Sequence, residues 1–227
     1  NTVETQEITV TYAGFTKTFN VIVNKKNPTL ADITYEIKDV TYNGSEQGII
    51  VSNKQGIVGL GNIVVKYNGN TQVPTNANTY EVSVLIEEGL NYNVLQEVVL
   101  GNYTINKEAQ NVPAISLDKQ EVKMTETAPK LSLSNAPMEN GQVSYESDNN
   151  QVATINEAGE ITLVGAGEVT FTVTYGETPN YTAKQAQVSL TVLRDTLKVE
   201  NFEITNTTQK YDGYKKEVTV TSKVEGI

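Results

Sequence analysis

The chain has 227 residues and a formal net charge of −10, and it contains neither cysteine nor histidine. These absences exclude a disulfide framework, a thiol nucleophile, a Cys/His zinc site and a Ser-His-Asp triad. The acidic balance argues against nucleic acid as a partner, because phosphate binding needs clustered basic residues. Apolar runs stay below the roughly 20 residues that span a bilayer, so we expect no membrane contact by this segment.

The first predicted element is a hairpin within residues 1–27. Alternating runs from Ile8 to Tyr12 and from Phe15 to Val23 flank Ala13-Gly14, and a glycine turn between such runs indicates a hairpin. A lone hairpin is marginal in water, so we interpret residues 1–27 as the closing hairpin of a truncated domain in a longer protein. The pattern resembles the close of a bacterial Ig-like domain of the third group, which implies that the truncated domain is Ig-like.

Residues 28–108 form the first complete predicted unit. Its clearest strand places Tyr80, Val82, Val84 and Ile86 on one face, and a two-residue period indicates a half-buried strand. A tyrosine that opens such a strand is typical of the tyrosine corner of an Ig sandwich. We therefore expect the Tyr80 hydroxyl to bond the backbone just upstream. Asn68-Gly69 predicts a further tight hairpin turn.

The motifs of this unit resemble those of a mostly bacterial immunoglobulin-like repeat, which implies a sandwich fold. The matching residues are Tyr42-Asn43-Gly44, Val65, Tyr67, Gly69, Pro74, Ala77, Tyr80, Val82, Val84, Asn91-Tyr92 and Tyr103-Thr104-Ile105. The chain departs from the family pattern at Asn43, where the family has Asp, and at Asn78, where it has Gly. We expect Asn78 to adopt a positive φ, because Asn is enriched there among non-glycine residues.

Residues 109–194 form the second complete unit. Along one strand, Val169, Phe171, Val173 and Tyr175 are predicted to face inward and Thr170, Thr172 and Thr174 outward. The run from Ser147 to Gly167 resembles a bacterial Ig-like domain of the second group, through Ser147-x-Asn149, Val152-Ala153, Gly159 and Gly165-x-Gly167. Gly159 is expected in the left-handed region. Asn180-Tyr181 repeats the predicted corner at Asn91-Tyr92.

Residues 195–227 are predicted to start another Ig-like repeat. Phe202-Glu203-Ile204 echoes Tyr35-Glu36-Ile37, Tyr211-Asp212-Gly213 echoes Tyr42-Asn43-Gly44, and Gly226-Ile227 echoes Gly56-Ile57. Internal self-similarity in the same order indicates an array of modules. The predicted fold class is therefore all-β, with tandem immunoglobulin-like β-sandwiches joined by short linkers.

Groups with potential chemistry are few. The carboxylates of Glu87-Glu88, and of Glu157 and Glu160, are predicted to be solvated on loops, whereas acid/base catalysis needs two carboxylates that converge in a cleft. Asp148-Asn149-Asn150 favours a turn whose side chains bond their own backbone over a calcium loop. Gly165-Ala166-Gly167 lacks the Lys-Ser/Thr of a phosphate loop. We therefore expect no enzyme activity, no metal and no cofactor.

Two alternatives stay open. Lys38 with Asn102 or Asn106 could form an intramolecular isopeptide bond. Five tyrosines could also form a sugar-stacking face: Tyr42, Tyr67, Tyr92, Tyr103 and Tyr181. Of these, Tyr92 and Tyr181 follow asparagine at the predicted corners and are the candidate ligand-binding residues.

These observations favour a structural function, a stalk or spacer array of Ig-like domains in a bacterial cell-surface or secreted protein. The expected localisation is extracellular or on the cell surface. The alternative is an adhesin or carbohydrate-binding module that uses sandwich loops or exposed tyrosines. The expected partners are neighbouring Ig-like domains of the same chain and, for the alternative, a host or matrix protein or a glycan.

Overall fold

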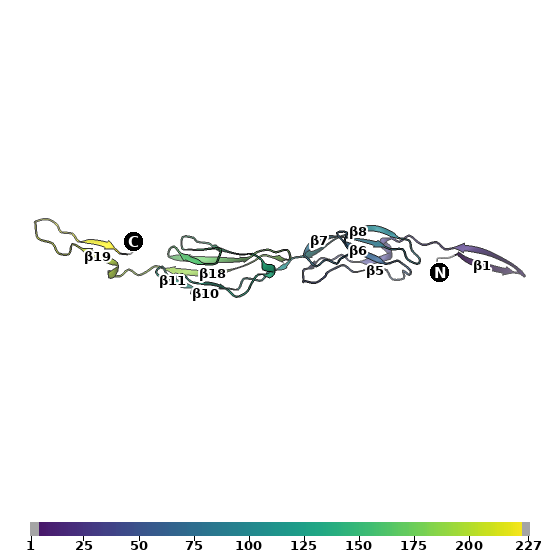
Figure 1. The fold of residues 1–227 in the computed structure, drawn as a ribbon, viewed down its shortest axis with the longest axis horizontal. Helices are drawn as coiled ribbons and strands as arrows, with labels where there is room; N and C mark the ends of the chain where they lie inside the picture. Colours follow the sequence, from purple (N-terminus) through teal and green to yellow (C-terminus); the bar gives the residue numbers. More distant parts are fainter. Residues whose placement is uncertain (1–4, 224–227) are drawn as a thin grey trace. The chain divides into compact units, whose positions relative to one another are not determined.

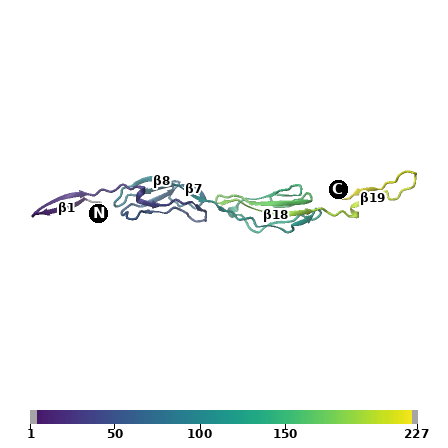
Figure 2. The ribbon, with the colours of Figure 1, turned by 180° about the vertical axis from the view of Figure 1, so that it is seen from behind.

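The fold is all-β in the computed structural model, which describes residues 5–223 (Figures 1 and 2). Within that range the helical segments are three short 3-10 turns, η1 (Leu30–Asp32), η2 (Met138–Asn140) and η3 (Val199–Asn201). The chain forms two compact units. The first comprises the residues up to Asn111 together with Pro137–Gln142 and Gly176–Lys184, and the second comprises the remainder.

The strands of the first unit are β1 (Thr5–Tyr12), β2 (Phe15–Ile22), β3 (Ile33–Tyr35), β4 (Val40–Thr41), β5 (Val51–Asn53), β6 (Ile63–Tyr67), β7 (Asn78–Ile86), β8 (Leu95–Asn106), β9 (Glu108–Ala109) and β17 (Tyr181–Thr182). Those of the second are β10 (Ile115–Leu117), β11 (Glu121–Lys123), β12 (Leu131–Leu133), β13 (Val143–Ser147), β14 (Ala153–Ile155), β15 (Ile161–Leu163), β16 (Gly167–Tyr175), β18 (Lys184–Leu193), β19 (Phe202–Thr205) and β20 (Thr219–Ser222). Strand β18 starts at the last residue of the first unit.

The first unit contains a sandwich of two sheets, one with the order β4-β8-β7-β6 and one formed by β3 and β5. Figure 1 shows β6, β7 and β8 side by side. Ile33 of β3 packs with Val84 and Ile86 of β7 in one part of the core. Tyr67, Val82, Tyr103 and Ile105 form the other part. The predicted alternation along β7 is confirmed, since Val82, Val84 and Ile86 are fully buried.

The outward face of β7 holds one residue that the alternation does not explain. Ser83 is buried although it points away from the core. Its hydroxyl donates to the Glu97 carboxylate at 2.6 Å, and Lys66 pairs with the other carboxylate oxygen. The neighbouring strands β6 and β8 supply these partners, so a polar side chain is covered without being left unpaired.

The second unit repeats the sandwich with its own core. Its main sheet has the order β11-β18-β16-β13, and two-stranded sheets pair β10 with β12 and β14 with β15. Val169, Phe171, Val173 and Tyr175 of β16 are all buried, as the alternation predicts. Gly159 has φ +78°, which confirms the left-handed turn between β14 and β15.

Two further hairpins expose their apolar faces. The β1–β2 hairpin turns at Ala13 (φ +49°) and Gly14 (φ +80°), as the sequence predicts. The β19–β20 hairpin pairs Phe202 with Ser222 and Ile204 with Val220. The order η3, β19, β20 repeats η1, β3, β5 of the first unit. The predicted echo at Gly226-Ile227 and the ends of the predicted segments, residues 1–4 and 224–227, lie outside the described residues.

One local prediction is wrong, and a second holds for the turn itself but not for the connection that the turn makes. Asn78 does not adopt a positive φ, because it is the first residue of β7, pairs with Ile105, and accepts the Thr79 N–H with its own side chain at 2.8 Å. Asn68-Gly69 does form a tight turn, but this turn returns the chain only to Asn70. A loop then precedes β7, whose Val82 is the partner of Tyr67. The turn is therefore not the connection of a two-residue hairpin.

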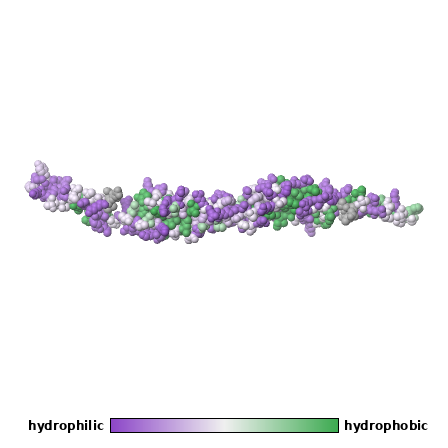
Figure 3. Space-filling view, in the orientation of Figure 1, coloured by the Kyte–Doolittle hydropathy of each residue, from purple (hydrophilic) through white to green (hydrophobic). Residues whose placement is uncertain are grey.

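The face shown in Figure 3 is mostly hydrophilic, with separate gatherings of apolar residues. Within residues 5–223, no helix has the length and apolar content needed to cross a membrane. The predicted boundaries at residues 27, 108 and 194 stay predictions. The structure adds that Pro137–Gln142 and Gly176–Lys184 belong with the first compact unit.

Candidate functional site

The two candidate ligand-binding tyrosines lie where the chain enters a sandwich. Tyr92 follows the loop after β7, and Tyr181 opens β17. Each is preceded by asparagine, and each Asn-Tyr pair forms hydrogen bonds with a linker segment that contains lysine. All of these residues belong to the first compact unit. We call these two arrangements linker clamps, one formed by residues 25–27 with 88–93 and one by residues 107–110 with 177–182.

The first linker clamp joins Lys25–Asn27 to the Asn91-Tyr92 corner. The Lys26 N–H donates to the Asn91 carbonyl and the Asn93 N–H to the Lys26 carbonyl, both at 2.9 Å, which makes a parallel bridge. The Lys26 ammonium lies 5.3 Å from the centroid of the Tyr92 ring, within cation–π range. Lys25 forms an ion pair with Glu88. Tyr92 is only 8% exposed, because the linker covers it.

The second linker clamp repeats this pattern in the same unit. Strand β9 pairs with β17 in parallel, so that Glu108 lies opposite Tyr181. The Glu108 N–H donates to the Asn180 carbonyl at 2.9 Å, as Lys26 does to Asn91. Lys107 forms an ion pair with Glu177, as Lys25 does with Glu88. The ring of Tyr181 meets the ring of Tyr42 edge-on, with centroids 5.5 Å apart, which is a favoured aromatic geometry.

Asn180 adds side-chain bonds that make the second linker clamp the more extensive one. Asn180 is only 4% exposed. Its amide donates to Glu139 at 2.6 Å and to Asn76 at 3.3 Å, and its carbonyl accepts the Ala77 N–H at 2.7 Å. A buried amide with every partner supplied by protein is well satisfied. Asn180 therefore ties segments that lie about a hundred positions apart in sequence.

The charges of the linker clamps are arranged to stay ionised. The hydrogen bond from the Asn180 amide lowers the pKa of Glu139 below its usual value. The hydrogen bond from Lys25 lowers the pKa of Glu88 in the same way. The backbone of Glu139 has a φ of +52°, a conformation that is uncommon for a residue with a β-carbon. Two bonds to Asn180, through its amide and its backbone N–H, accompany that conformation.

The five tyrosines of the predicted sugar-stacking face do not form one exposed surface. Tyr67 and Tyr103 belong to the core of the first sandwich. Tyr92 is covered in the first linker clamp, and Tyr42 and Tyr181 are half-buried against each other. Stacking on a sugar ring needs an open aromatic face. The ligand-binding role of Tyr92 and Tyr181 stays a prediction, and the geometry supports a role in holding linkers.

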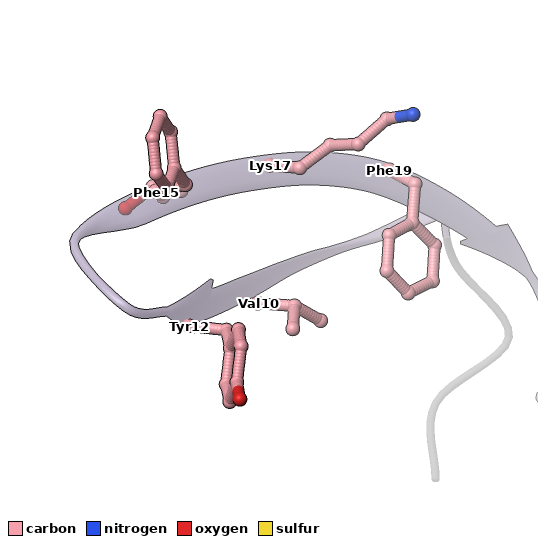
Figure 4. A pocket seen from close by; sticks show the side chains of 6 residues that line it. Val10, Tyr12, Phe15, Lys17 and Phe19 are labelled. Atoms are coloured by element: carbon pink, nitrogen blue, oxygen red, sulfur yellow. The ribbon is translucent and has the colours of Figure 1, made fainter.

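The exposed aromatic rings lie elsewhere. Tyr12 and Phe15 of the β1–β2 hairpin are 83% and 82% exposed. With Val10, Lys17 and Phe19 they line a shallow concavity, and Figure 4 shows Val10, Tyr12 and Phe19 projecting from one side of the hairpin. We interpreted this hairpin from the sequence as the close of a truncated domain, and this surface was therefore not among the predicted sites.

The remaining candidates are engaged in local structure. Asn149 accepts the Gln151 N–H, which confirms a turn bonded by its own side chain there. The Asp148 side chain instead accepts the Thr170 N–H of β16. No group of three or more potential metal-ligating side chains occurs among the residues that the structure describes. The Asn106 amide donates to the Val40 carbonyl at 3.2 Å, and the isopeptide alternative stays untested.

The sequence located the two Asn-Tyr corners but not their partners. Each corner forms an ion pair with its linker, Lys25 with Glu88 and Lys107 with Glu177, and the two residues of each pair are separated by 63 and 70 positions. Each corner also follows a glutamate four positions before its tyrosine. That recurring spacing could have suggested that the two corners share a role. The hydrogen bond between Glu139 and Asn180 has no such sequence signal, because it depends on the fold alone.

Comparison with known proteins yields one family match. Residues 139–177 match the model of the immunoglobulin-like domain of intimin. The match begins within η2, extends just past β16 and includes Glu139, which accepts the Asn180 amide of the second linker clamp. It covers part of the predicted second sandwich and is a different bacterial Ig-like family from those that the motifs resemble. No curated protein matches the chain.

Two of the solved structures with similarity to the chain are the following. One is Drosophila N-cadherin EC1-3, at 11% identity and a TM-score of 0.30, covering 85% of this chain and 78% of that one. Another is a SusE-like surface-located polysaccharide-binding protein of Bacteroides thetaiotaomicron, at 14% identity and a TM-score of 0.30, covering 76% of this chain and 35% of that one. Similarity at this level carries no argument about function.

Proposed function

We propose that this chain is a spacer segment of a bacterial cell-surface or secreted protein, in which each linker clamp fixes the chain as it enters a sandwich. The observation that carries the proposal is the recurrence of the linker clamp. Both copies use a backbone bond to an Asn-Tyr corner, an aromatic contact and a Lys-Glu ion pair. A device that recurs at successive linkers serves the spacing of modules. The proposal gives these residues no catalytic role.

Two further observations support the proposal. The similarity of residues 139–177 to the intimin immunoglobulin-like domain favours a bacterial surface or extracellular setting. The second linker clamp buries Asn180 with side-chain partners on two different segments, Asn76-Ala77 and Glu139. A buried polar network of this kind specifies one arrangement when all of its members are satisfied. Surface ion pairs alone would contribute little, typically about 0–1 kcal/mol.

The experiment measures how tightly the linker is held. Because the chain has no cysteine, spin labels can be placed at Glu81→Cys and Ala183→Cys, which are exposed positions of the same compact unit. Pulsed electron–electron double resonance then reports the distribution of distances between the two spin labels. We expect a narrow distribution that broadens in Asn180→Ala, which removes the amide bonds to Glu139, Asn76 and Ala77.

The matched control is Asn102→Ala, which changes an exposed asparagine on β8. It should leave the distribution as it is in the parent chain. Circular dichroism establishes that each variant is folded. A distribution equally broad in the parent chain and in Asn180→Ala would overturn the proposal, because the linker clamp would then hold nothing in place.

A second candidate function is adhesion through exposed aromatic rings. The observation that favours it is the concave surface of the β1–β2 hairpin, where Tyr12 and Phe15 are mostly exposed (Figure 4). Aromatic residues are enriched among the anchors of binding surfaces. A glycan and matrix-protein array probed with the chain, and with Tyr12→Ala, Tyr92→Ala and Tyr181→Ala, tests it. Saturable binding that one folded variant loses would favour adhesion, and a blank array would favour the spacer.

A further inference from the structure

Three Asn-Gly pairs occur in the chain, Asn43-Gly44, Asn68-Gly69 and Asn140-Gly141. An asparagine followed by glycine can lose its side-chain amide, because the glycine nitrogen is unhindered and can attack the Asn Cγ. Attack requires the glycine nitrogen to rotate toward the side chain. The backbone around each pair therefore decides which of the three can react.

Two of the three pairs are held in conformations that oppose attack. Asn68 and Asn140 have φ of +49° and +53°. In this left-handed region ψ is typically about +47°, which turns the next nitrogen to the side opposite the β-carbon. Asn68 is also bonded to Glu81 through both its N–H and its side chain. The Gly141 nitrogen already donates to the Met138 carbonyl at 3.0 Å.

The third pair differs in its backbone conformation. Asn43 does not have a positive φ, and both Asn43 and Gly44 are exposed. A β-carbon built on Gly44 would meet nothing within 4 Å, as is also true of Gly69, so space is available at both turns and the backbone conformation separates them. The Ser45 N–H donates to Oδ1 of Asn43 at 2.9 Å. That oxygen gains negative charge when Cγ is attacked, and a donor aimed at it stabilises the charge. Asn68 has such a donor too, in the Glu81 N–H, so the positive φ of Asn68 is what sets that pair apart.

We propose that Asn43-Gly44 is a site of spontaneous deamidation. The Gly44 nitrogen loses its proton and forms a bond to Cγ of Asn43, and the side-chain nitrogen leaves as ammonia. The product is a cyclic imide. Water then opens the imide: cleavage of the bond to Cγ yields aspartate, and cleavage of the bond to the main-chain carbonyl carbon yields isoaspartate. No redox step is involved, and water is the only co-reactant.

The two products differ in their effect on the fold. Aspartate preserves the turn, as the third repeat shows: Asp212 in the equivalent Tyr-Asp-Gly accepts the Tyr214 N–H at 3.1 Å, as Asn43 accepts that of Ser45. Isoaspartate instead lengthens the main chain by one carbon immediately after Tyr42. The Tyr42 N–H donates a hydrogen bond to the Asn106 carbonyl at 2.8 Å, and the Tyr42 ring contacts the ring of Tyr181. Isoaspartate therefore loosens the second linker clamp at its aromatic contact.

The experiment incubates the full chain at mildly alkaline pH and maps its peptides by mass spectrometry over time. We expect the peptide with Asn43 to exchange an NH2 group for OH before the peptides with Asn68 and Asn140, which serve as internal controls. Isoaspartyl methyltransferase labelling should appear on the same peptide. Equal retention of the amide at all three pairs, or faster loss at Asn68 or Asn140, would overturn the proposal.

Two variants separate the chemistry from its consequence. Asn43→Gln should block the reaction, because the ring that would have to close is larger. Freshly prepared Asn43→Asp supplies aspartate before isoaspartate forms, because Asp-Gly loses water to the same imide more slowly than Asn-Gly loses ammonia, so it should keep the slow hydrogen exchange of the Tyr42 N–H. The aged parent chain should lose that protection in proportion to its isoaspartate content. Protection that persists in fully converted protein would show that the linker clamp does not depend on this turn.

Discussion

Two tyrosines of the first sandwich use their hydroxyls in opposite ways. The Tyr67 hydroxyl accepts the Ile49 N–H at 2.8 Å inside the core, where burial raises the pKa of Tyr67. The Tyr80 hydroxyl donates to the Asn76 carbonyl at 2.8 Å, which confirms the predicted bond of the tyrosine corner. The Tyr80 bond lies near the surface, where water can replace the lost partner.

We expect Tyr67→Phe to destabilise the chain more than Tyr80→Phe. Loss of the Tyr67 hydroxyl leaves the Ile49 N–H without its acceptor, which costs about 1–3 kcal/mol for a buried group. Loss of the Tyr80 hydroxyl costs about 1 kcal/mol or less, the net value of an ordinary hydrogen bond. Urea denaturation of both variants measures the difference. Equal costs would mean that water reaches Ile49 in Tyr67→Phe.

At the scale of an element, the turn η1 is closed by one carboxylate. Asp32 is 4% exposed and accepts bonds from Lys26 at 2.6 Å, from the Thr29 N–H at 2.9 Å and from the Thr29 hydroxyl at 3.1 Å. The hydrogen bond from Lys26 is the main cause of a lowered pKa of Asp32, followed by that from the Thr29 N–H. In η3 the same position is Asn201, which accepts the Lys198 N–H at 2.6 Å.

This carboxylate should make stability depend on acidity. The pKa of Asp32 is lower in the folded chain than its unfolded value of about 3.9, so ionised Asp32 stabilises the fold above that pH. The contribution is lost as the pH falls through the folded pKa. Thermal unfolding between pH 2 and pH 6 (roughly the range over which a carboxyl titrates) should show this loss. Asp32→Asn should show a smaller dependence, whereas Ser52→Ala, at an exposed and non-ionisable position on β5, should match the parent chain.

For the whole molecule, stability should come from the cores of the sandwiches and not from metals or cross-links. The chain has no cysteine, and residues 5–223 present no cluster of potential metal ligands. We expect the same melting temperature with and without a chelator, and with and without a reductant. A lower melting temperature with chelator would reveal a metal site. An intact mass stably lower by one ammonia would indicate the isopeptide bond of Lys38.

Features that depend on neighbouring residues could be predicted from the sequence, whereas features that depend on distant segments could not. The alternation at Val82, Val84 and Ile86 and at Val169, Phe171 and Val173 determined the strands and their buried faces, because a strand has a side-chain period of two. The glycine turns at Gly14 and Gly159 were likewise readable, since a positive φ favours glycine. Asn78 was misjudged because pairing with Ile105 extended its backbone, and this pairing partner lies far along the chain.

The linker clamps depended on the tertiary structure. The motif Asn-Tyr marked Asn91-Tyr92 and Asn180-Tyr181 as corners, but no local pattern indicated that Lys26 would cover the first ring or that Tyr42 would meet the second. Glu139 reaches Asn180 only because the fold brings them together. Local backbone preferences are encoded within a few residues, whereas the burial of a side chain is decided by segments that approach it from elsewhere in the chain. For that reason the sequence determined the sandwiches, and the tertiary structure decided what their tyrosines contact.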